Sequence, residues 1–219
     1  MARIAEDLLL LLVDNPASAP RIDRSKLSRV LAAALVLDLA YECRVRPSLP
    51  GEPVPPGHLV ALAGPVPMDP AVRPTMTLLS KAPLTPAAAI SKLRKHAEDD
   101  VLDQLLRTGE LHQIQLSSHR LRRNDYAWPL HDRARVDQVR GALLATLFEQ
   151  RRPNPVTAVI AGLLQRVNGL PAVLDLDEAA LAHAAGRADE IAGGTWADAA
   201  NTAEVNLAVT AAAVLPALG

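Results

Sequence analysis

The first apolar segment of the chain is short and directly follows acidic residues. Leu8 to Val13 are six consecutive large apolar residues, preceded by Glu6 and Asp7. A membrane-spanning helix needs about 20 apolar residues, and a secretory signal needs a basic start and a longer apolar region. Residues 17–19, Ala-Ser-Ala, resemble a signal-cleavage site, but the acidic flank does not fit an exported leader. The pattern predicts a short core helix with acidic residues at its N-terminus, where the helix dipole favours them.

Apolar residues at helical spacing predict further helices along most of the chain. Leu27, Val30, Leu31 and Leu35 belong to one such series and predict a central helix over residues 25–41. No other segment reaches membrane-spanning length. The remaining predicted helices cover residues 85–107, with a break near His96, and residues 133–150, 156–167, 177–191 and 201–215.

Capping residues mark where three of these helices begin. Thr85 and Asn154 are each followed by proline, and Asp177 precedes an alanine-rich helical stretch. Such side chains accept hydrogen bonds from first-turn N–H groups, and the fixed φ of proline suits the first helical position. Gly109 follows the predicted end of the second long helix and is a typical stop signal.

Two segments predict β-hairpins between the helices. PSLPGEPVPPG, residues 47–57, contains five prolines in eleven residues, so it is not a regular helix, and the short apolar stretches beside it could pair as strands. Residues 111–130 alternate apolar and polar positions around a Ser-Ser-His-Arg centre.

Composition restricts the core and the compartment. The chain has 219 residues, 49% of them hydrophobic, but Phe148 is the only phenylalanine. The core therefore consists mainly of Leu, Val, Ala and Ile, which suits packed helices, and the length allows one domain or two small ones. Cys43 is the only cysteine, which excludes an intramolecular disulfide and fits a reducing cytoplasm.

Charge is unevenly distributed, although the formal net charge is only −1. Residues 112–152 contain eight arginines and four acids, whereas residues 175–204 contain seven acids and only Arg187. A bipolar molecule of this kind can turn one face toward an anionic surface and remain soluble. The alternative is a solvated helix surface with charge pairs inside the molecule.

The sequence contains no recognisable catalytic pattern. It has no Gly-rich phosphate loop, no Gly-x-Ser-x-Gly and no His-Glu-x-x-His, and its six histidines lack a metal-ligand spacing. The acidic residues 98–100 point in different directions on a predicted helix surface, without the burial that raises a catalytic pKa. Cys43 lacks a matched base and is expected to be a small core residue, while His112 and His119 are expected to be ordinary hairpin residues. We therefore expect no enzyme activity, no catalytic residue, no metal and no cofactor.

Five apolar motifs, in this order and spacing, resemble the Golgi phosphoprotein 3 family. They are IAEDLLLLLVDN, LSRVLAAALVLDLAYECRV, LLRTGELHQ, DYAWPLHD and PNPVTAVIAGLLQRVNGLPAVL. The resemblance covers essentially the whole chain, and the Ala/Arg/Pro-rich composition of the chain suits the bacterial members, many of which come from actinobacteria. It implies that residues 1–219 form a single mainly α domain, with a central helical bundle ringed by amphipathic helices and one or more small β-hairpins.

The resemblance also implies a lipid and a set of binding positions. Eukaryotic members are peripheral membrane adaptors that recognise phosphatidylinositol 4-phosphate and hold glycosyltransferases in the Golgi. Their headgroup pocket uses a Trp and three Arg, which correspond here to Asp23, Ala32, Lys95 and Glu98. Only Lys95 keeps a cation. The lost ring and the added acid weaken charge-assisted recognition, so the specific lipid does not follow from the resemblance.

Other cations are placed to rebuild an anion site in a shifted register. Arg21, Arg24, Arg29 and Arg94 lie near the family positions in the sequence. The family hairpin contributes to membrane contact and oligomerisation, and here its tip, residues 117–125, combines Leu121 with three arginines. Each cation near an anionic surface contributes about 1 kcal/mol, without much headgroup selectivity. The candidate lipid-binding residues are Arg21, Arg24, Arg94, Lys95, Arg120, Arg122 and Arg123.

Two functions of different classes follow from these observations. The first is a non-catalytic peripheral membrane module that binds anionic lipid, by resemblance phosphatidylinositol 4-phosphate or a related phosphoinositide. It would be an adaptor for membrane enzymes with a protein cargo, cytoplasmic or on the inner face of the plasma membrane, and a homo-oligomer through the 111–130 hairpin. The second is a winged-helix-like DNA-binding protein, because residues 93–128 contain a helix, a glycine turn and a hairpin. Four acids between Glu98 and Asp103 would repel DNA phosphates, which disfavours a nucleic-acid partner.

Overall fold

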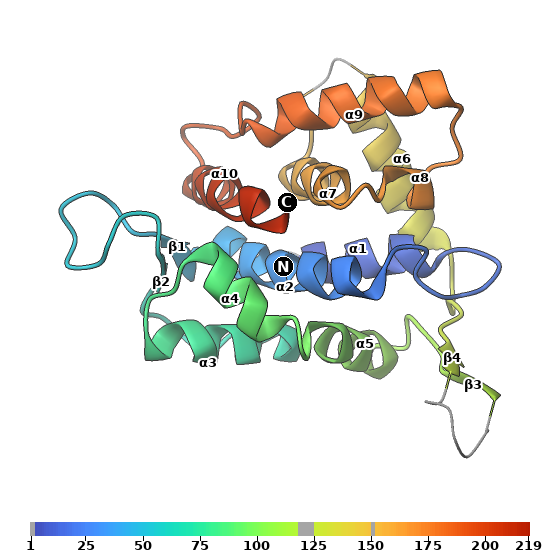
Figure 1. Ribbon diagram of the computed structural model, residues 1–219, viewed down its shortest axis with the longest axis horizontal. Helices are drawn as coiled ribbons and strands as arrows, with labels where there is room; N and C mark the ends of the chain where they lie inside the picture. Colours follow the sequence, from blue (N-terminus) through green and yellow to red (C-terminus); the bar gives the residue numbers. More distant parts are fainter. Residues whose placement is uncertain (1–2, 118–124, 150–151) are drawn as a thin grey trace.

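Three layers of helices make up the protein. The computed structural model describes residues 3–117, 125–149 and 152–219. Helices α1 (Ile4–Val13) and α2 (Arg24–Tyr41) lie between a layer of α3, α4 and α5 and a layer that contains α7, α9 and α10 (Figure 1). Buried side chains from helices in all three layers belong to one hydrophobic cluster. The predicted mainly α fold, with a central bundle and small hairpins, is confirmed.

The apolar run at the start of the chain is core, as its length predicted. Every residue of α1 except Asp7 is buried. The side-chain carboxyl group of Asp38, in the last turn of α2, accepts hydrogen bonds from the N–H groups of Ile4 at 2.7 Å and Ala5 at 3.1 Å. Because first-turn N–H groups have no partner within their own helix, Asp38 satisfies donors that would otherwise be buried without an acceptor.

The predicted central helix is α2, and it is buried from Val30 to Ala40 without interruption. Such complete burial explains why both faces of this helix are apolar, since neighbouring helices cover all its sides. None of the helices in the described ranges combines the length and the apolar character needed to cross a membrane.

The layer with α3 contains elements that the sequence predicted and one helix that it did not. Helix α4 (Pro86–Leu93) begins at Thr85, which caps the N–H of Ala88, and α5 (Ala97–Arg107) begins after the predicted break at His96. Helix α3 (Arg73–Lys81) and the preceding 3-10 turn η1 (Pro70–Val72) were not predicted. Thr75 and Leu79 are buried and Met76 and Leu78 pack against the core, so α3 has an apolar side. It is only nine residues long, however, and Pro74 and Pro83 lie near its ends, which made its helical period easy to miss.

The last third of the chain forms the opposite layer largely as predicted. Asn154 and Asp177 cap α7 and α9, as their positions indicated. The short α8 and the final 3-10 turn η2 were not predicted. The elements are α6 (Ala134–Phe148), α7 (Pro155–Arg166), α8 (Leu170–Val173), α9 (Glu178–Ala192), α10 (Thr202–Val214) and η2 (Leu215–Leu218).

Both predicted hairpins are present. Strands β1 (Val45–Pro47) and β2 (Leu59–Ala61) pair in antiparallel fashion beside the proline-rich loop. Strands β3 (Ile114–Ser117) and β4 (Asp125–Ala127) form the second pair, with a register shift between Gln115 and Ser117. The tip of the second hairpin, with Leu121 and its neighbouring arginines, lies outside the described residues.

Candidate anion-binding site

A cavity of about 460 Å³ opens where the N-terminus of α2 meets the junction of α4 and α5. It collects three of the seven residues that the sequence indicated, and two serines that it did not. Its lining consists of Arg24, Ser25, Ser28, Arg94, Lys95, Glu98 and Asp99.

The first turn of α2 supplies one wall of this cavity. Its N-cap residue Asp23 makes no side-chain capping bond, and the first helical hydrogen bond runs from the N–H of Leu27 to the carbonyl of Asp23 at 2.8 Å. The N–H groups of residues 24–26 precede that bond, and the helix dipole adds partial positive charge at this end. The hydroxyl of Ser28 donates to the carbonyl of Ser25, which leaves the Ser28 oxygen able to accept.

The break between α4 and α5 supplies the opposite wall. Leu93 and Ala97 are buried on either side of the break, and Arg94 and Lys95 between them are exposed. The N–H of Arg94 ends α4 with a bond to Ile90, and the N–H of His96 bonds to Leu93. The two buried anchors therefore hold a tight turn that directs its cations away from the core.

Acidic residues reduce the positive charge of the cavity. Glu98 lies 3.6 Å from the guanidinium of Arg24, and Asp99 is also part of the lining. Three cations and two acids give a formal excess of one positive charge (3 − 2 = +1). The sequence expectation that an acid at Glu98 weakens phosphate recognition is therefore consistent with its position in the cavity.

A second cavity, of about 530 Å³, adjoins the first and shares Arg24, Glu98 and Asp99 with it. Tyr126 and Trp128, at the end of the second hairpin, contribute to its lining, and their ring centroids are 5.8 Å apart. The sequence reasoning missed these aromatic residues because the family position for a tryptophan corresponds to Asp23. No sequence signal places residues 24 and 128 at the same cavity, because their proximity depends on how the hairpin packs.

Other candidate residues lie elsewhere. Arg21 is exposed in the loop before α2 but is not part of the cavity lining. Arg29 donates to the carbonyl of Ala217 at 2.8 Å, and Ala32 is buried. The hairpin-tip candidates Arg120, Arg122 and Arg123 lie outside the described residues.

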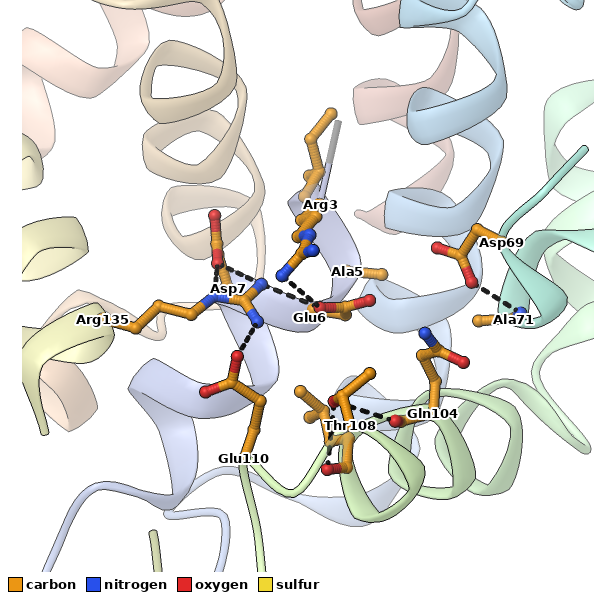
Figure 2. A network of polar contacts seen from close by, with 12 residues as sticks. Arg3, Ala5, Glu6, Asp7, Asp69, Ala71, Gln104, Thr108, Glu110 and Arg135 are labelled. Carbon is orange, nitrogen blue, oxygen red and sulfur yellow. Dashed lines mark hydrogen bonds and ion pairs between the residues drawn. The ribbon is translucent and has the colours of Figure 1, made fainter. Parts of the chain in front are cut away.

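The arginines of α6 and its flanks do not form a basic face, contrary to the expectation for residues 112–152. Arg135 pairs with Glu6 at 2.8 Å, Asp7 at 2.7 Å and Glu110 at 2.9 Å (Figure 2). Other pairs join Arg133 and Arg140 to Asp14, and Arg152 to Glu204. The alternative, charge pairs inside the molecule, holds for these arginines, because their acidic partners come from parts of the chain that a local charge count does not include.

The pairs around Arg135 are buried enough to alter ionisation. Burial raises the pKa of Glu6 and of Asp7, and the nearby Arg135 only partly offsets this effect. Burial also opposes the charged form of Arg135, but Asp7 and Glu6 outweigh it and raise the pKa of the guanidinium. Arg135, with three carboxylate partners, thus ties α1, α6 and the turn after α5 together, and Arg3 adds a weaker pair to Glu6 at 3.8 Å (Figure 2).

A different segment carries cations that are not neutralised. Residues 70–97 contain five cations and no acid. All five side chains are exposed, and within the part of the chain that the structure describes none of them forms an ion pair. This acid-free run is visible in the sequence, but the prediction of a basic surface rested on residues 112–152 alone. The cations are Arg73, Lys81, Lys92, Arg94 and Lys95.

The acidic segment lies on the other side of the molecule. Residues 175–204 include α9 and the start of α10, and α1 and α2 separate this layer from α3, α4 and α5 (Figure 1). The bipolar distribution predicted from residues 112–152 is therefore wrong for the described part of that segment, and the unpaired cations of residues 70–97 lie instead in the layer opposite the acidic segment.

Cys43 and the histidines are residue types that could serve in catalysis or metal binding. Cys43 is half-buried just after α2, with a φ of 54°, and is not in the hydrophobic cluster, so the expectation of a core residue is wrong. The Nε2 atom of His112 lies 2.9 Å from the Nδ1 atom of His131. Among the described residues, no group of three or more His, Cys, Asp or Glu side chains is arranged to hold a metal ion.

The fold and the site together define a mainly helical protein with a buried pair of central helices, small hairpins and a cation-lined surface cavity. A model of the Golgi phosphoprotein 3 (GPP34) family matches residues 4–208, and the chain belongs to that family. No curated protein matches the chain.

Proposed function

We propose that the protein is a non-catalytic peripheral membrane module, which binds the phosphate-bearing headgroup of an anionic lipid in the cavity at the N-terminus of α2. The observation that carries this proposal is the convergence of Arg24, Arg94 and Lys95 on a helix N-terminus. Guanidinium and ammonium groups make charge-assisted bonds to phosphate, and free N–H groups at a helix N-terminus add further donors.

The shape of the site supports a phosphoinositide as the ligand. Lys95 and Arg94 lie on the turn where they can meet a phosphate, while Tyr126 and Trp128 in the adjoining cavity offer aromatic faces on which the C–H side of an inositol ring can stack. Family membership favours phosphatidylinositol 4-phosphate or a related lipid. The small positive excess of the cavity leads us to expect weaker, more salt-dependent binding than a site without acids would give.

Further roles follow from the family rather than from the site. We propose that the protein works in the cytoplasm, on the inner face of the plasma membrane, as an adaptor that holds a membrane enzyme as cargo. Oligomerisation through the second hairpin belongs to the same proposal. For DNA binding no such support exists, because Asp99 and Asp103 on the exposed side of α5 would face the phosphates.

Removing the two cations of the α4–α5 turn tests the headgroup site. In co-sedimentation with phosphatidylcholine vesicles that contain phosphatidylinositol 4-phosphate, Arg94→Ser with Lys95→Ser is expected to weaken binding by about tenfold or more, from about 1 kcal/mol per cation. The matched control is Arg166→Ser with Arg187→Ser, which removes the same charge from α7 and α9. Equal losses in both pairs would contradict a specific site and indicate only a net-charge effect.

The hairpin tip is expected to act differently from the cavity. Changing Arg120, Arg122 and Arg123 together to Ser should abolish pelleting with phosphatidylserine vesicles and leave the thermal unfolding midpoint nearly unchanged, because the tip attracts anionic lipid without selecting a headgroup. Unchanged pelleting would remove the tip from the mechanism. A DNA mobility-shift assay beside these measurements tests the second function, and tight, salt-dependent DNA binding without vesicle binding would favour it over the lipid proposal.

A further inference from the structure

The loop between β2 and η1, residues 62–69, exposes apolar side chains that no part of the described structure covers. Val66 and Met68 are 75% and 80% exposed, the two largest values among the large apolar side chains of the described residues. Pro65 and Pro67 flank Val66, and Pro67 is buried. Because proline fixes φ, the loop presents its two apolar side chains on a restricted backbone.

Two arginines donate hydrogen bonds to four backbone carbonyls of this loop. Arg44 donates to the carbonyls of Leu62, at 3.2 Å, and Pro65. Arg73 donates to the carbonyls of Pro67, at 2.9 Å, and Met68, at 3.2 Å. Moving a carbonyl group out of water costs less free energy when the carbonyl already accepts a hydrogen bond. These contacts therefore lower the free-energy cost of moving the loop into a less polar medium.

Gly64 makes this arrangement possible. Its φ is 157°, and a Cβ at this position would lie 3.0 Å from the Cζ atom of Arg44. The absence of a side chain therefore lets the guanidinium lie directly against the loop backbone.

A cavity of about 540 Å³ lies beside the loop and is positively charged. Its lining includes Arg44, Arg73 and Lys81, together with Thr77 and Ser80, and contains no acidic residue. None of the three cations forms an ion pair with a carboxylate in the described ranges. Apolar side chains next to unneutralised cations match the interfacial region of an anionic bilayer, where acyl chains lie next to phosphates.

We propose that the 62–69 loop is a second membrane contact, in which Val66 and Met68 enter the interface of an anionic bilayer while Arg44, Arg73 and Lys81 meet lipid phosphates. This inference rests on the proposed membrane function and adds a contact that is separate from the headgroup cavity. It assigns the surface to lipid rather than to a second copy of the chain, because the three cations of the cavity lining would face the same three cations of an identical copy.

A fluorescent label at the loop tests insertion directly. In the full chain with Cys43→Ser, Met68→Cys carries an environment-sensitive nitrobenzoxadiazole group. We expect a blue shift, and quenching by spin-labelled lipid, with phosphatidylcholine vesicles that contain phosphatidylserine and phosphatidylinositol 4-phosphate. The control label, at Val209→Cys on α10, lies in the opposite layer (Figure 1) and should show neither change.

A binding measurement tests the contribution of the apolar side chains. Val66→Ser with Met68→Ser should lower partitioning to these vesicles by about tenfold, since two apolar side chains lose their burial in the interface. The matched pair, Val205→Ser with Val209→Ser, removes exposed apolar side chains from α10 and should leave partitioning unchanged.

The possible outcomes separate this inference from the proposed function. Vesicle binding that depends on Arg94 and Lys95, without a spectral change at residue 68, overturns the loop contact and leaves the headgroup site in place. A blue shift at residue 68 with normal binding of the Arg94 and Lys95 variant supports the loop and contradicts the headgroup cavity. Loss of self-association in the Val66 and Met68 variant, measured by sedimentation velocity, with unchanged partitioning would assign the surface to a second copy and overturn the proposal.

Discussion

Arg135→Ala is expected to lower the free energy of unfolding by about 3–5 kcal/mol, because it leaves Asp7 and Glu110 without this cation and Glu6 with only the more distant Arg3, at 3.8 Å. The side chain of Arg135 is 18% exposed and those of Glu6 and Asp7 are 5% and 15% exposed. The measurement is urea unfolding at pH 8. The loss should be smaller at pH 5, where protonation can neutralise Glu6 and Asp7.

The sign of that pH effect follows from the carboxyl pKa values. Burial raises the pKa of Glu6 and Asp7 even with Arg135 present, and removing the cation raises it further. A carboxyl group with a raised folded-state pKa stabilises the protein below its unfolded pKa and loses this contribution as the pH rises through the folded value. The variant should therefore lose more stability than the parent between pH 5 and pH 8.

The control for Arg135→Ala is another arginine with an acidic partner. Arg166 is exposed and lies 3.9 Å from Asp189, so Arg166→Ala should cost no more than about 1 kcal/mol, as for surface ion pairs generally. Similar losses in the two variants would show that the contacts of Arg135 do not stabilise the fold in the way described.

Most elements of the fold were predictable from the sequence, but helix α3 was not. Element types followed from local signals: the length of the run at Leu8 to Val13, the cap at Thr85 and the break at His96. Helix α3 gave only a weak signal, because it has nine residues and prolines lie near both of its ends. A local pattern predicts an element when burial on one side imposes a period over several turns, and α3 is too short to show more than about two turns.

The candidate site was predictable where residues share a turn or lie near the binding positions of the family. Arg94 and Lys95 share a turn, and Arg24, like Arg94, was selected because it lies near those family positions. Trp128 reaches the same region through a hairpin, and the charge of Arg135 is neutralised by α1, more than 120 residues away in the chain. Such pairings depend on tertiary packing, so a count of arginines in residues 112–152 overestimated the available positive charge.

The other large effect is expected at Asp38, which joins α1 to α2. Asp38→Ala removes the acceptor for the buried N–H groups of Ile4 and Ala5, and should lower the free energy of unfolding by roughly 2–4 kcal/mol, since each buried donor without a partner costs about 1–3 kcal/mol. Asp38→Asn keeps the shape and one acceptor oxygen, so it should cost less. Urea unfolding at pH 6 measures both variants.

Asp38 should also make the stability of the parent protein depend on pH. Burial raises the pKa of Asp38 to about 8, although the N–H groups of Ala5 and Ile4 oppose the shift. Since the ordinary value is 3.8, the folded protein holds a proton here that the unfolded chain has lost between these two pH values. The contribution of Asp38 to stability is therefore complete below about pH 4 and decreases as the pH rises toward about 8.

The Asn variant isolates this contribution, because it cannot ionise while the other buried acids remain. Its free energy of unfolding should fall less than that of the parent protein between pH 5 and pH 8, so the difference between the two should narrow, or reverse in favour of Asn, at the higher pH. The decrease in the free energy of unfolding that remains in the Asn variant between these pH values comes from Glu6, Asp7 and other groups whose pKa is also raised. Parallel stability curves for the two proteins would mean that Asp38 is ionised in the folded state throughout this range, as a carboxylate held by the N–H groups of α1.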